Sequence, residues 1–441
     1  MNLLNKFLDN KTIGLLGFGR EGLSSYQYLR KHCPNAKIMV FEDKAIEIID
    51  SNLKVFPLAE WPKSKANVDI FLKSPGLPWS ADFYSGGVII TSQVELFMQY
   101  ALGRKIGITG SAGKSSTTSF IFELLKQNNY PAFIGGNFEI PLFDFISDLN
   151  SNSISVVELS SYQLKPLRKN PEISIYLNFY PDHLDYHKTE QDYFDSKCNI
   201  YLYQNKNDLL ITDFNLLPKL PAVKGRVQTV SNSQKESNAF IADGKIKTIN
   251  NKEFSLEKFK PRGLGFHSNL GAAILAVKEI GLSNDEINKV IPKLNTPPHR
   301  LEDIGKCGGV LFFNDSISTI PETALHAINS IKEADSMIVG GFDRGLNQNL
   351  LINELKNNPK FLKIVCMGQT GKNIFEKVFP LLGDKVYQTD ILQEAVEQII
   401  KTKGVKCCLL SPGAPSFGLF RNFEERGQRL KEIIQKLNTI G

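Results

Sequence analysis

Short apolar runs alternate along the chain with stretches in which apolar residues recur at helical spacing. Runs at residues 11–17, 37–44 and 68–78 end in glycine-rich turns or acidic residues, and an apolar run followed by an amphipathic stretch closes this block. Strands that alternate with helices indicate βαβ units and a parallel sheet. The pattern therefore predicts an α/β fold whose first domain ends near residue 103.

The same alternation continues in two further blocks. The second block ends in a polar segment at 213–262, which predicts a small antiparallel patch, and a helix at 265–281. The Pro-Pro pair in "NTPPHR", residues 295–300, breaks any helix and predicts a linker. A third α/β block follows, so we expect three domains at 1–103, 104–297 and 298–441, the first and third Rossmann-like.

Composition and charge argue against some classes of protein, such as nucleic-acid-binding and membrane proteins, but do not identify the function. The 441 residues carry a net charge of +6, which suits an anionic small-molecule substrate, and we expect no nucleic-acid partner because no dense basic block or zinc-finger spacing occurs. The six cysteines form no C-x-x-C pair, which indicates reduced thiols. We find no long apolar run and therefore expect no membrane insertion, and a cytoplasmic location.

The stretch "GITGSAGKSSTT", from Gly107, reads as a strand end, a tight loop and a helix start. Helix N-termini offer unpaired N–H groups and a partial positive charge to phosphate, and Lys114 adds a full charge. The spacing departs from the standard phosphate loop, because Ile108 stands where the first glycine is usual. We predict a central P-loop ATPase domain, and the alternative is a turn that binds nothing.

A second glycine turn, G-x-G-x-x-G at residues 17–22, follows the first predicted strand, and Asp43 lies at the end of the next. A dinucleotide such as NAD is the competing interpretation of this weak motif. Two phosphate loops in one chain favour two nucleotides, one in a bound nucleotide-sugar and one in consumed ATP.

Acidic and histidine side chains gather between residues 158 and 197. His183 and His187 have the i, i+4 spacing that could bind zinc on a helix, although no third ligand is obvious. Helix capping by Asp182 with solvent-facing histidines is a second possibility. The interpretation that we favour is a Mg²⁺ site built by Glu158 and His183.

Nine ordered motifs carry a resemblance that spans essentially the whole chain. They are "GITGSAGKSSTT", "GGN", "ELSSYQL", "NFYPDHLDYH", Tyr193-x-x-x-Lys197, "GFHSN", "PHRLE", "NDS" and "LLSPGAPSFGLFRNFEERG". In this order they resemble the Mur ligases, and most closely the glutamate-adding member of that family. The resemblance implies a UDP-binding first domain, an ATP-binding second domain and a third domain that binds the amino acid.

The resemblance also implies an activity and a set of site residues. ATP would convert the carboxylate of UDP-N-acetylmuramoyl-L-alanine to an acyl phosphate, which glutamate would attack, in peptidoglycan synthesis by a monomeric enzyme.

The catalytic positions implied are Lys114, His183, Lys197, Arg300 and Asp315. ATP would contact Gly110, Ser111, Ala112, Gly113, Lys114, Ser115, Ser116, His267, Arg300 and Asp315. The UDP-substrate would contact Gly17, Phe18, Gly19, Arg20, Gly22, Asp43, Ser74, Gly76, Asn137, Ser160 and His183. Glutamate would contact Thr319, Arg344, Ser416, Asn422 and Phe423, and Mg²⁺ would bind Ser115, Glu158, His183 and Lys197, the last carbamylated by CO₂.

The chain departs from the family pattern in two places. Ile317 and Arg344 stand where lysines are usual, and Ser268 and Gly271 replace two asparagines that the family uses around adenine. The first pair predicts L-glutamate as the substrate, with the usual D-glutamate as the alternative. A folylpolyglutamate synthase-like ligase and a non-catalytic nucleotide-binding regulator are two further hypotheses for the function.

Overall fold

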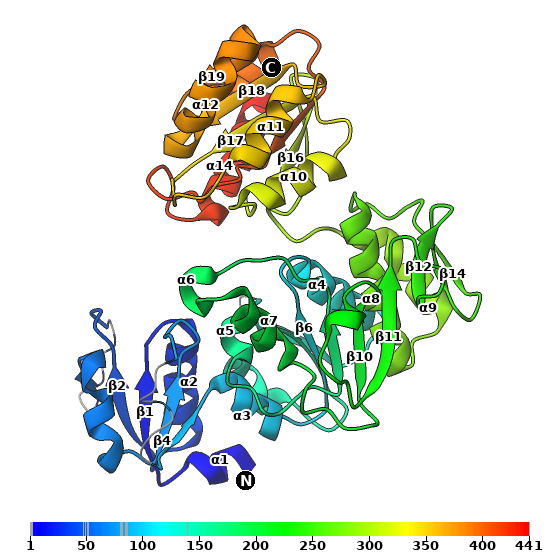
Figure 1. The fold of residues 1–441 in the computed structure, drawn as a ribbon. Coiled ribbons are helices and arrows are strands. Elements are labelled where there is room, and N and C mark those ends of the chain that lie inside the picture. The colour runs from blue at the N-terminus through cyan, green and yellow to red at the C-terminus, as the bar shows by residue number, and fades with distance from the viewer. Residues whose placement is uncertain are drawn as a thin grey trace. The chain divides into compact units, whose positions relative to one another are not determined.

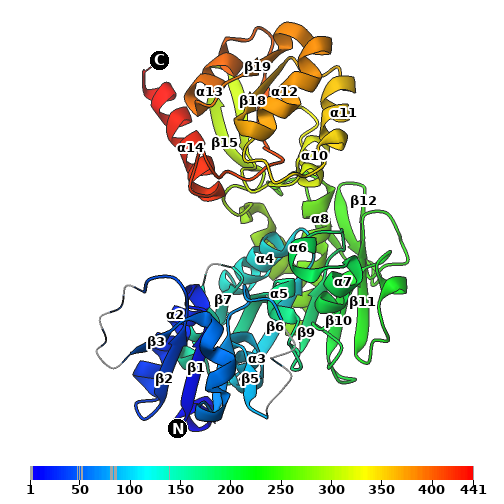
Figure 2. The same ribbon diagram turned by 60° about the vertical axis from the view of Figure 1, so that its left-hand side comes forward.

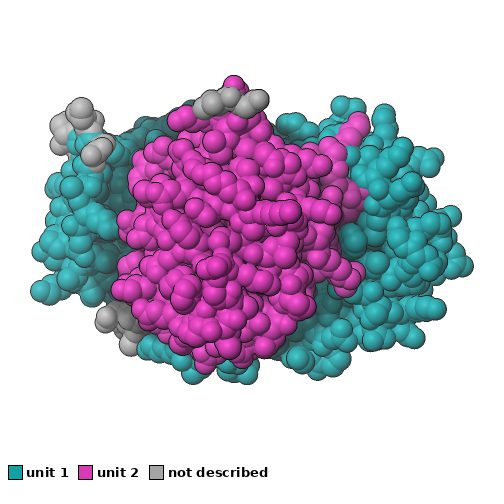
Figure 3. All heavy atoms as spheres, turned by 90° about the horizontal axis from the view of Figure 1, so that it is seen from above, with its two compact units in different colours: residues 1–258, 267–292 teal, residues 259–266, 293–441 magenta. Residues whose placement is uncertain are grey.

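The computed structural model describes residues 3–46, 48, 50, 53–79, 83, 87–138 and 140–440, without the side chains of residues 184, 185 and 440. It contains three sheets, and the chain divides into two compact units, 1–258 with 267–292 and 259–266 with 293–441 (Figures 1 and 3). The α/β prediction is confirmed, while the three domain boundaries stay a prediction. Among the described residues, no helix is both long and apolar enough to cross a membrane.

The first sheet is wholly parallel, with the order β3-β2-β1-β4-β5. The order reverses between β1 and β4, and crevices at such switch points collect ligands at the carboxyl ends of the strands. The elements are α1 (Leu3–Leu8), β1 (Thr12–Leu16), α2 (Arg20–His32), β2 (Lys37–Phe41), β3 (Lys54–Phe56), β4 (Ile70–Lys73), β5 (Ile89–Thr91) and α3 (Gln93–Tyr100).

The second sheet has nine strands in the order β14-β13-β12-β11-β10-β9-β6-β8-β7. It is parallel from β7 to β12, and β12, β13 and β14 form the predicted antiparallel patch. Its strands are β6 (Arg104–Thr109), β7 (Ala132–Gly136), β8 (Ile154–Glu158), β9 (Ile173–Tyr176), β10 (Leu209–Asp213), β11 (Arg226–Ser231), β12 (Ala239–Ala242), β13 (Lys245–Thr248) and β14 (Glu253–Ser255). The helices of this part are α4 (Lys114–Lys126), α5 (Ser161–Leu164), α6 (Leu184–His187), α7 (Glu190–Cys198), α8 (Leu264–Ile280) and α9 (Asn284–Val290).

The third sheet has the order β15-β16-β20-β17-β18-β19, and only β15 pairs antiparallel within it. Figure 2 shows α13 and α14 on one face and α10, α11 and α12 on the other, as in a doubly wound fold. The elements are β15 (Glu302–Cys307), β16 (Val310–Asn314), α10 (Pro321–Ser330), β17 (Ser336–Gly340), α11 (Asn349–Asn357), β18 (Lys363–Met367), α12 (Gly368–Leu382), β19 (Val386–Gln388), α13 (Leu392–Lys401), β20 (Cys407–Leu410) and α14 (Phe423–Ile440).

Buried apolar side chains explain why these segments are strands. All four residues of β4, β9 and β20 are buried, as both faces of a covered parallel sheet require. One core cluster runs continuously from α1 and β1 into the loop at 142–149 and on to β10. The six cysteines are free and buried, which agrees with the expected reduced thiols.

Candidate active site

The second glycine loop connects β6 to α4 as predicted. Gly113 has a φ of 83° and is the N-cap of α4, and no side chain caps this helix. A side chain at position 113 would also collide with Asn269, whose Oδ1 lies 2.6 Å from the place of a Cβ atom. The loop therefore leaves the helix N-terminus open to a ligand, with the partial positive charge that suits phosphate.

Two lysines converge on one carbonyl oxygen of this loop. Lys114 Nζ donates to Gly110 O at 2.9 Å and to Ser111 O at 3.2 Å, and Lys197 Nζ donates to Gly110 O at 2.8 Å. Lys197 is only 1% exposed and stands 4.6 Å from the centre of the Tyr193 ring. Burial, and then the charge of Lys114, lower the pKa of Lys197 well below its ordinary value, which favours the neutral, nucleophilic amine.

Side chains that the sequence did not single out hold the loop in place. Ala112 N donates to Asn178 Oδ1 at 2.8 Å, and Asn178 Nδ2 returns a hydrogen bond to Ala112 O at 3.0 Å. Ser111 Oγ donates to Tyr180 O and accepts from Tyr180 N, both at 2.9 Å. Ser111 is thus engaged with the loop after β9, while Ser115 and Ser116 are buried in the first turn of α4.

Glu158, at the end of β8, presents an oxygen with no hydrogen bond. Its Oε1 accepts from Asn137 Nδ2 at 2.8 Å, whereas its buried Oε2 receives no hydrogen bond from the part of the chain that the structure describes. A carboxylate oxygen left in this way fits a hard cation such as Mg²⁺. No group of three histidine, cysteine or acidic residues that could hold a metal occurs among the described residues, but Mg²⁺ usually takes one or two carboxylates together with substrate phosphates.

The two histidines of this region do not share a helix face. His183 has a φ of 55° and precedes α6, and its Nδ1 lies 2.8 Å from Tyr162 Oη. His187 is fully buried, with Nε2 2.9 Å from Ser161 Oγ, so the prediction of solvent-facing histidines is wrong for it. Burial lowers the pKa of His187 to about 4. The zinc alternative is not supported, because it required both residues on one helix.

The predicted adenine region of α8 is arranged differently from the family pattern. Ser268 donates to Asn232 Oδ1 at 2.6 Å, and a Cβ atom at Gly271 would press on Val230, so these two positions pack against β11 and its loop. His267 is half-buried. Asn269 is 7% exposed and lies against Gly113, so it is the side chain of α8 that reaches the phosphate loop. Sequence reasoning missed it because it compared only positions 268 and 271.

The first glycine loop, after β1, is held by a serine and an acid. Gly17 has a φ of 83°, and Ser74 Oγ donates to Gly17 O at 3.1 Å. A Cβ atom at Gly22 would stand 2.4 Å from Gly17 O, which explains the glycine. Glu42 Oε2 accepts from Phe18 N at 2.8 Å, and this hydrogen bond is the main reason that the pKa of Glu42 is lowered.

The remaining predicted residues of this loop lie at its rim. The exposed Asp43 accepts from Leu58 N at 2.9 Å, so the acid that touches the loop is its neighbour in sequence. Arg20 is exposed, and among the described residues nothing lies within 4 Å of a Cβ atom built at Gly19 or Gly76. Gly19 and Gly76 follow the carboxyl ends of β1 and β4.

The first loop is tied to the second sheet within the same compact unit. Tyr186 Oη donates to Pro75 O at 3.2 Å and to Leu77 O at 3.1 Å, in the turn that follows Ser74. Ser160 caps α5 in a capping box with Gln163. Gln163 Nε2 also donates to Glu21 Oε1 at 2.6 Å, which brings together two regions predicted to bind one substrate, the first glycine loop and the segment 158–163.

A separate cluster surrounds Asp315 at the carboxyl end of β16 in the third sheet. The buried Asp315 accepts from Leu301 N at 3.1 Å, Ser318 Oγ at 2.5 Å and Ser411 Oγ at 2.7 Å. Burial raises the pKa of Asp315 to about 6. Arg300 is half-buried and precedes Leu301, which has a φ of 45°.

A buried arginine that sequence reasoning missed organises the same cluster. Arg426 is 3% exposed and donates to Ser316 Oγ at 2.9 Å, Ser316 O at 2.8 Å and Ala414 O at 3.1 Å. Burial lowers the pKa of Arg426 to about 9. The guanidinium joins the loop after β16 to the loop after β20, which contains the buried Ser416.

The positions predicted to bind glutamate differ in exposure. Asn422 Oδ1 accepts from Glu425 N at 2.8 Å and so caps α14, and the Phe423 ring faces His299. Arg344 is exposed and lies 5.7 Å from the centre of the Phe417 ring. Thr319 is half-buried, as is Ile317. All come from loops at the carboxyl ends of β16, β17 and β20.

Comparison with known proteins agrees with this architecture. The model of the Mur ligase middle domain matches residues 108–276. Among solved structures, MurF ligase from Thermotoga maritima in complex with ADP superposes with a TM-score of 0.62 at 16% identity, covering 99% of this chain and 97% of that one. UDP-N-acetylmuramate-alanine ligase MurC, also from Thermotoga maritima, gives 0.59 at 16% identity, covering 97% and 99%. These likenesses show a shared three-domain α/β fold.

Sequence relatives are similar along their full lengths. A protein of Clostridium tetani is 31% identical over 459 aligned residues, covering 99% of each chain, and one of Acetivibrio thermocellus is 32% identical, covering 100% of this chain and 99% of that one. The chain therefore belongs to the Mur ligase family, and it is an enzyme of the ligase class. Both relatives carry the name UDP-N-acetylmuramoylalanine–D-glutamate ligase.

Proposed function

We propose that the protein is an ATP-dependent ligase that joins glutamate to UDP-N-acetylmuramoyl-L-alanine in peptidoglycan synthesis. The observation that carries the proposal is that Lys114 and Lys197 both donate to Gly110 O at an open helix N-terminus. The negative charge of Glu158 opposes the lowering of the Lys197 pKa by burial. A site that places the charge of Lys114 and an open helix N-terminus at a glycine loop suits phosphoryl transfer, in which catalysis is mostly positioning and charge neutralisation. The names of the full-length relatives supply the substrates.

The reaction has two balanced steps. A carboxylate oxygen of the alanyl substrate attacks the γ-phosphorus of ATP, the bond to the β-bridging oxygen breaks, and ADP leaves. The neutral amine of glutamate then attacks the acyl carbon, phosphate leaves, and the amine gives up a proton as the amide forms. Lys114 and the N-terminal end of α4 neutralise the phosphates, and Arg300 and Asp315 are proposed to contact ATP in the same reaction.

Glu158 fits a metal because its Oε2 is buried without a hydrogen bond from the described residues. Together with the Ser115 hydroxyl and His183 it would hold Mg²⁺, which would supply charge neutralisation at the phosphates. Lys197 fits carbamylation, because a buried, neutral amine can add to CO₂ and release one proton to give a carbamate anion. The carbamate would place negative charge beside Lys114.

The two organic substrates have separate proposed sites. The nucleotide-sugar is assigned to the first glycine loop, Ser74 and the segment 158–163, since these contact one another through Tyr186 and Gln163. Its full set is Gly17, Phe18, Gly19, Arg20, Gly22, Asp43, Ser74, Gly76, Asn137, Ser160 and His183. Glutamate is assigned to the third sheet, at Thr319, Arg344, Ser416, Asn422 and Phe423. For ATP we add Asn269 to His267 on α8.

The enantiomer of glutamate is a separate part of the proposal. L-glutamate is favoured by Ile317 and Arg344, which replace lysines, because inverting the α-carbon moves the carboxylates and a guanidinium can grip one with two parallel hydrogen bonds. D-glutamate is favoured by the names of the relatives. We predict kcat/KM for L-glutamate about tenfold above that for D-glutamate, roughly 1.4 kcal/mol. Arg344→Lys should reduce this preference, and faster turnover of D-glutamate by the parent would decide for the second enantiomer.

The proposed function is tested by phosphate release from ATP with each substrate omitted in turn. We expect release only when UDP-N-acetylmuramoyl-L-alanine and glutamate are both present, in equal amount to the amide product. Release that ignores the nucleotide-sugar would favour a folate-type ligase, and binding of ATP without any turnover would favour a regulator. Bicarbonate is supplied throughout so that Lys197 can be modified.

A further inference from the structure

A half-buried acid and a buried lysine that the proposed reaction does not use lie beside the first glycine loop. Glu21 stands in the first turn of α2, and Lys73 is the last residue of β4 and is 4% exposed. Burial raises the pKa of Glu21 to about 7 and lowers that of Lys73 to about 7. Ionisable groups are costly to bury without partners, so their placement calls for a reason.

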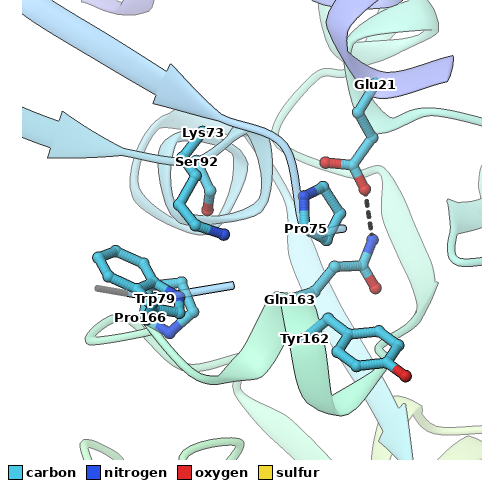
Figure 4. Close-up of a pocket in the computed structure, with 8 residues that line it drawn as sticks. All are labelled: Glu21, Lys73, Pro75, Trp79, Ser92, Tyr162, Gln163 and Pro166. Carbon is cyan, nitrogen blue, oxygen red and sulfur yellow. Dashed lines mark hydrogen bonds between the residues drawn. The ribbon is translucent and has the colours of Figure 1, made fainter. Parts of the chain in front are cut away.

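Both side chains line a small cavity of ≈ 10 Å³, about the space that one water molecule requires. Figure 4 shows Lys73 extending beside Trp79, and Glu21 joined to Gln163. Lys73 Nζ donates to Ser74 O at 3.0 Å and lies 4.9 Å from the centre of the Trp79 ring. The cavity walls come from the first sheet, through Lys73, and from α5 of the second sheet, through Gln163.

A chain of hydrogen bonds leads from Glu21 to the candidate active site. Gln163 Nε2 donates to Glu21 Oε1 at 2.6 Å. The opposite end of the same amide, Gln163 Oε1, accepts from Ser160 N at 2.9 Å and from Ser160 Oγ at 3.0 Å. Glu21 therefore fixes which way the Gln163 amide points, and the amide fixes the turn that follows Glu158. Because Gln163 has one acceptor end and one donor end, both contacts are made only in this orientation.

We propose that Glu21 is a positioning residue that aligns the Ser160 turn with the first glycine loop, while Lys73 balances its charge from across the cavity. The proposal rests on the proposed function, since the two aligned segments are those assigned to the nucleotide-sugar. Ionised Glu21 accepts hydrogen bonds with both oxygens, and the protonated acid keeps one oxygen that accepts, so in either form Oε1 can receive the N–H₂ group of the amide. Misplacing one of the two segments should weaken binding of the nucleotide-sugar and leave ATP binding unchanged.

Two single variants test the contact. Glu21→Ala removes the acceptor, and Gln163→Glu places two carboxylates in contact. We expect each to raise the Kd of UDP-N-acetylmuramoyl-L-alanine, measured by calorimetry without ATP, and its KM by about tenfold, as loss of a charge-assisted hydrogen bond does. The KM for ATP should stay within about twofold. Glu397→Ala is the matched control, because Glu397 Oε1 accepts from Gln393 Nε2 at 3.1 Å on the exposed face of α13.

The double variant that exchanges Glu21 and Gln163 is the strongest test of the contact between these two side chains. In Glu21→Gln with Gln163→Glu, the new carboxylate can still accept from Ser160 N and Oγ, and the new amide can donate to it. We expect the double variant to bind the nucleotide-sugar within about threefold of the parent, whereas Gln163→Glu alone stays weak. Thermal midpoints show whether each variant is folded, and Glu21→Leu, which fills the space without an acceptor, replaces Glu21→Ala should that variant be unfolded.

The outcomes separate this inference from the proposed function. An unchanged Kd for the nucleotide-sugar in the folded Glu21 and Gln163 variants overturns the positioning role. A double variant no better than Gln163→Glu overturns it as well, as does an equal rise in the KM values of ATP and nucleotide-sugar, which marks a purely structural contact. A parent protein that does not bind UDP-N-acetylmuramoyl-L-alanine at all overturns the proposed function instead.

Discussion

The two glycine loops share the order strand, turn and helix, and they differ in the charged side chains that lie against them. Each follows a buried strand, turns at a glycine with a φ of 83° and starts a helix of 13 residues. At the second loop two lysines donate to one carbonyl oxygen, Gly110 O. At the first loop acids lie against the turn, since Glu42 accepts from Phe18 N and Glu21 stands in the first turn of α2.

This difference suggests different tasks for the same turn. A loop that carries the charge of Lys114 at an open helix N-terminus suits the phosphoryl transfer that we propose. At the first loop acids lie against the turn, and the contacts of its serine and backbone suit the recognition of a nucleotide-sugar that we propose. The backbone supplies a turn and a helix end, and the side chains that fold onto it decide between catalysis and binding.

Lys114→Ala should have the largest effect on the comparison. Removing this charge is expected to lower kcat by roughly 10³-fold or more, because a charged donor at the developing negative charge is lost. The Kd of UDP-N-acetylmuramoyl-L-alanine should remain within about twofold, since the first loop is intact. Rapid-quench measurement of ADP formation and calorimetry give the two values. Lys126→Ala, at the opposite end of α4, is the control, and near-normal turnover in Lys114→Ala would refute the assignment.

Lys197→Ala tests whether the second lysine acts as a carbamate. We expect a loss of turnover of roughly 10³-fold, with partial recovery when acetate or formate supplies the missing carboxylate oxygens. Depletion of bicarbonate should slow the parent and not the variant. Lys105→Ala is the matched control, because Lys105 is also buried, 6% exposed, and donates to Gly103 O at 3.0 Å. A parent that is indifferent to bicarbonate would contradict the carbamate.

The sequence predicted both loops because a strand, a glycine turn and a helix are local features. Through the family resemblance it named Ser74 and Lys197, which bond the two loops, but it did not predict Asn178 or Glu42. Asn178 lies 66 residues from Ala112, and Glu42 lies 24 residues from Phe18, so only the paired strands bring them together. The motif after β2 suggested Asp43, but alternation along the strand end turns Glu42 toward the loop and Asp43 toward Leu58.

Residue spacing along the chain gave a wrong interpretation where the backbone is not a regular helix. The i, i+4 relation of His183 and His187 was interpreted on a helix, whereas His183 has a left-handed φ of 55° before α6. In α8 the comparison of positions 268 and 271 overlooked Asn269. Gly271 packs on Val230 of β11, whereas Asn269 lies against Gly113, and this orientation of the helix is known only from the folded structure. Register between elements is a property of tertiary packing, and a single sequence does not contain it explicitly.

Asn269→Ala should affect the second loop and not the first. The amide is buried against Gly113, so its removal opens space beside the phosphate loop and takes away a polar group that we propose to contact ATP. We expect the KM for ATP to rise about tenfold, with the KM for the nucleotide-sugar unchanged. Ser268→Ala serves as the control, since that hydroxyl bonds Asn232 instead. Equal effects of the two substitutions on ATP would show that Asn269 has no special role.

Glu42→Gln gives the smallest expected effect and addresses the first loop. The carboxylate accepts from Phe18 N, Asp43 N and Lys44 N, and the neutral amide should hold them less well. We expect the KM of the nucleotide-sugar to rise about threefold, and the free energy of unfolding at pH 7 to fall by roughly 1 kcal/mol. Asp69→Asn is the control, because that carboxylate also accepts from a backbone N–H group, Thr12 N, but at the amino end of β1.

The pH dependence of the free energy of unfolding tests whether Glu42 stabilises the folded protein as the ionised carboxylate. The pKa of Glu42 is lowered in the folded protein, chiefly by the Phe18 N–H group, so the unfolded chain binds its proton at higher pH than the folded protein does. The stabilisation is therefore present above the unfolded pKa of 4.5 and is lost as the pH falls through the folded value. Urea unfolding of parent and Glu42→Gln should give free energies that differ at pH 7 and converge toward pH 3. A difference that grows on acidification would mean that Glu42 is held as the protonated acid, and the first loop would then lack the negative charge that distinguishes it from the second.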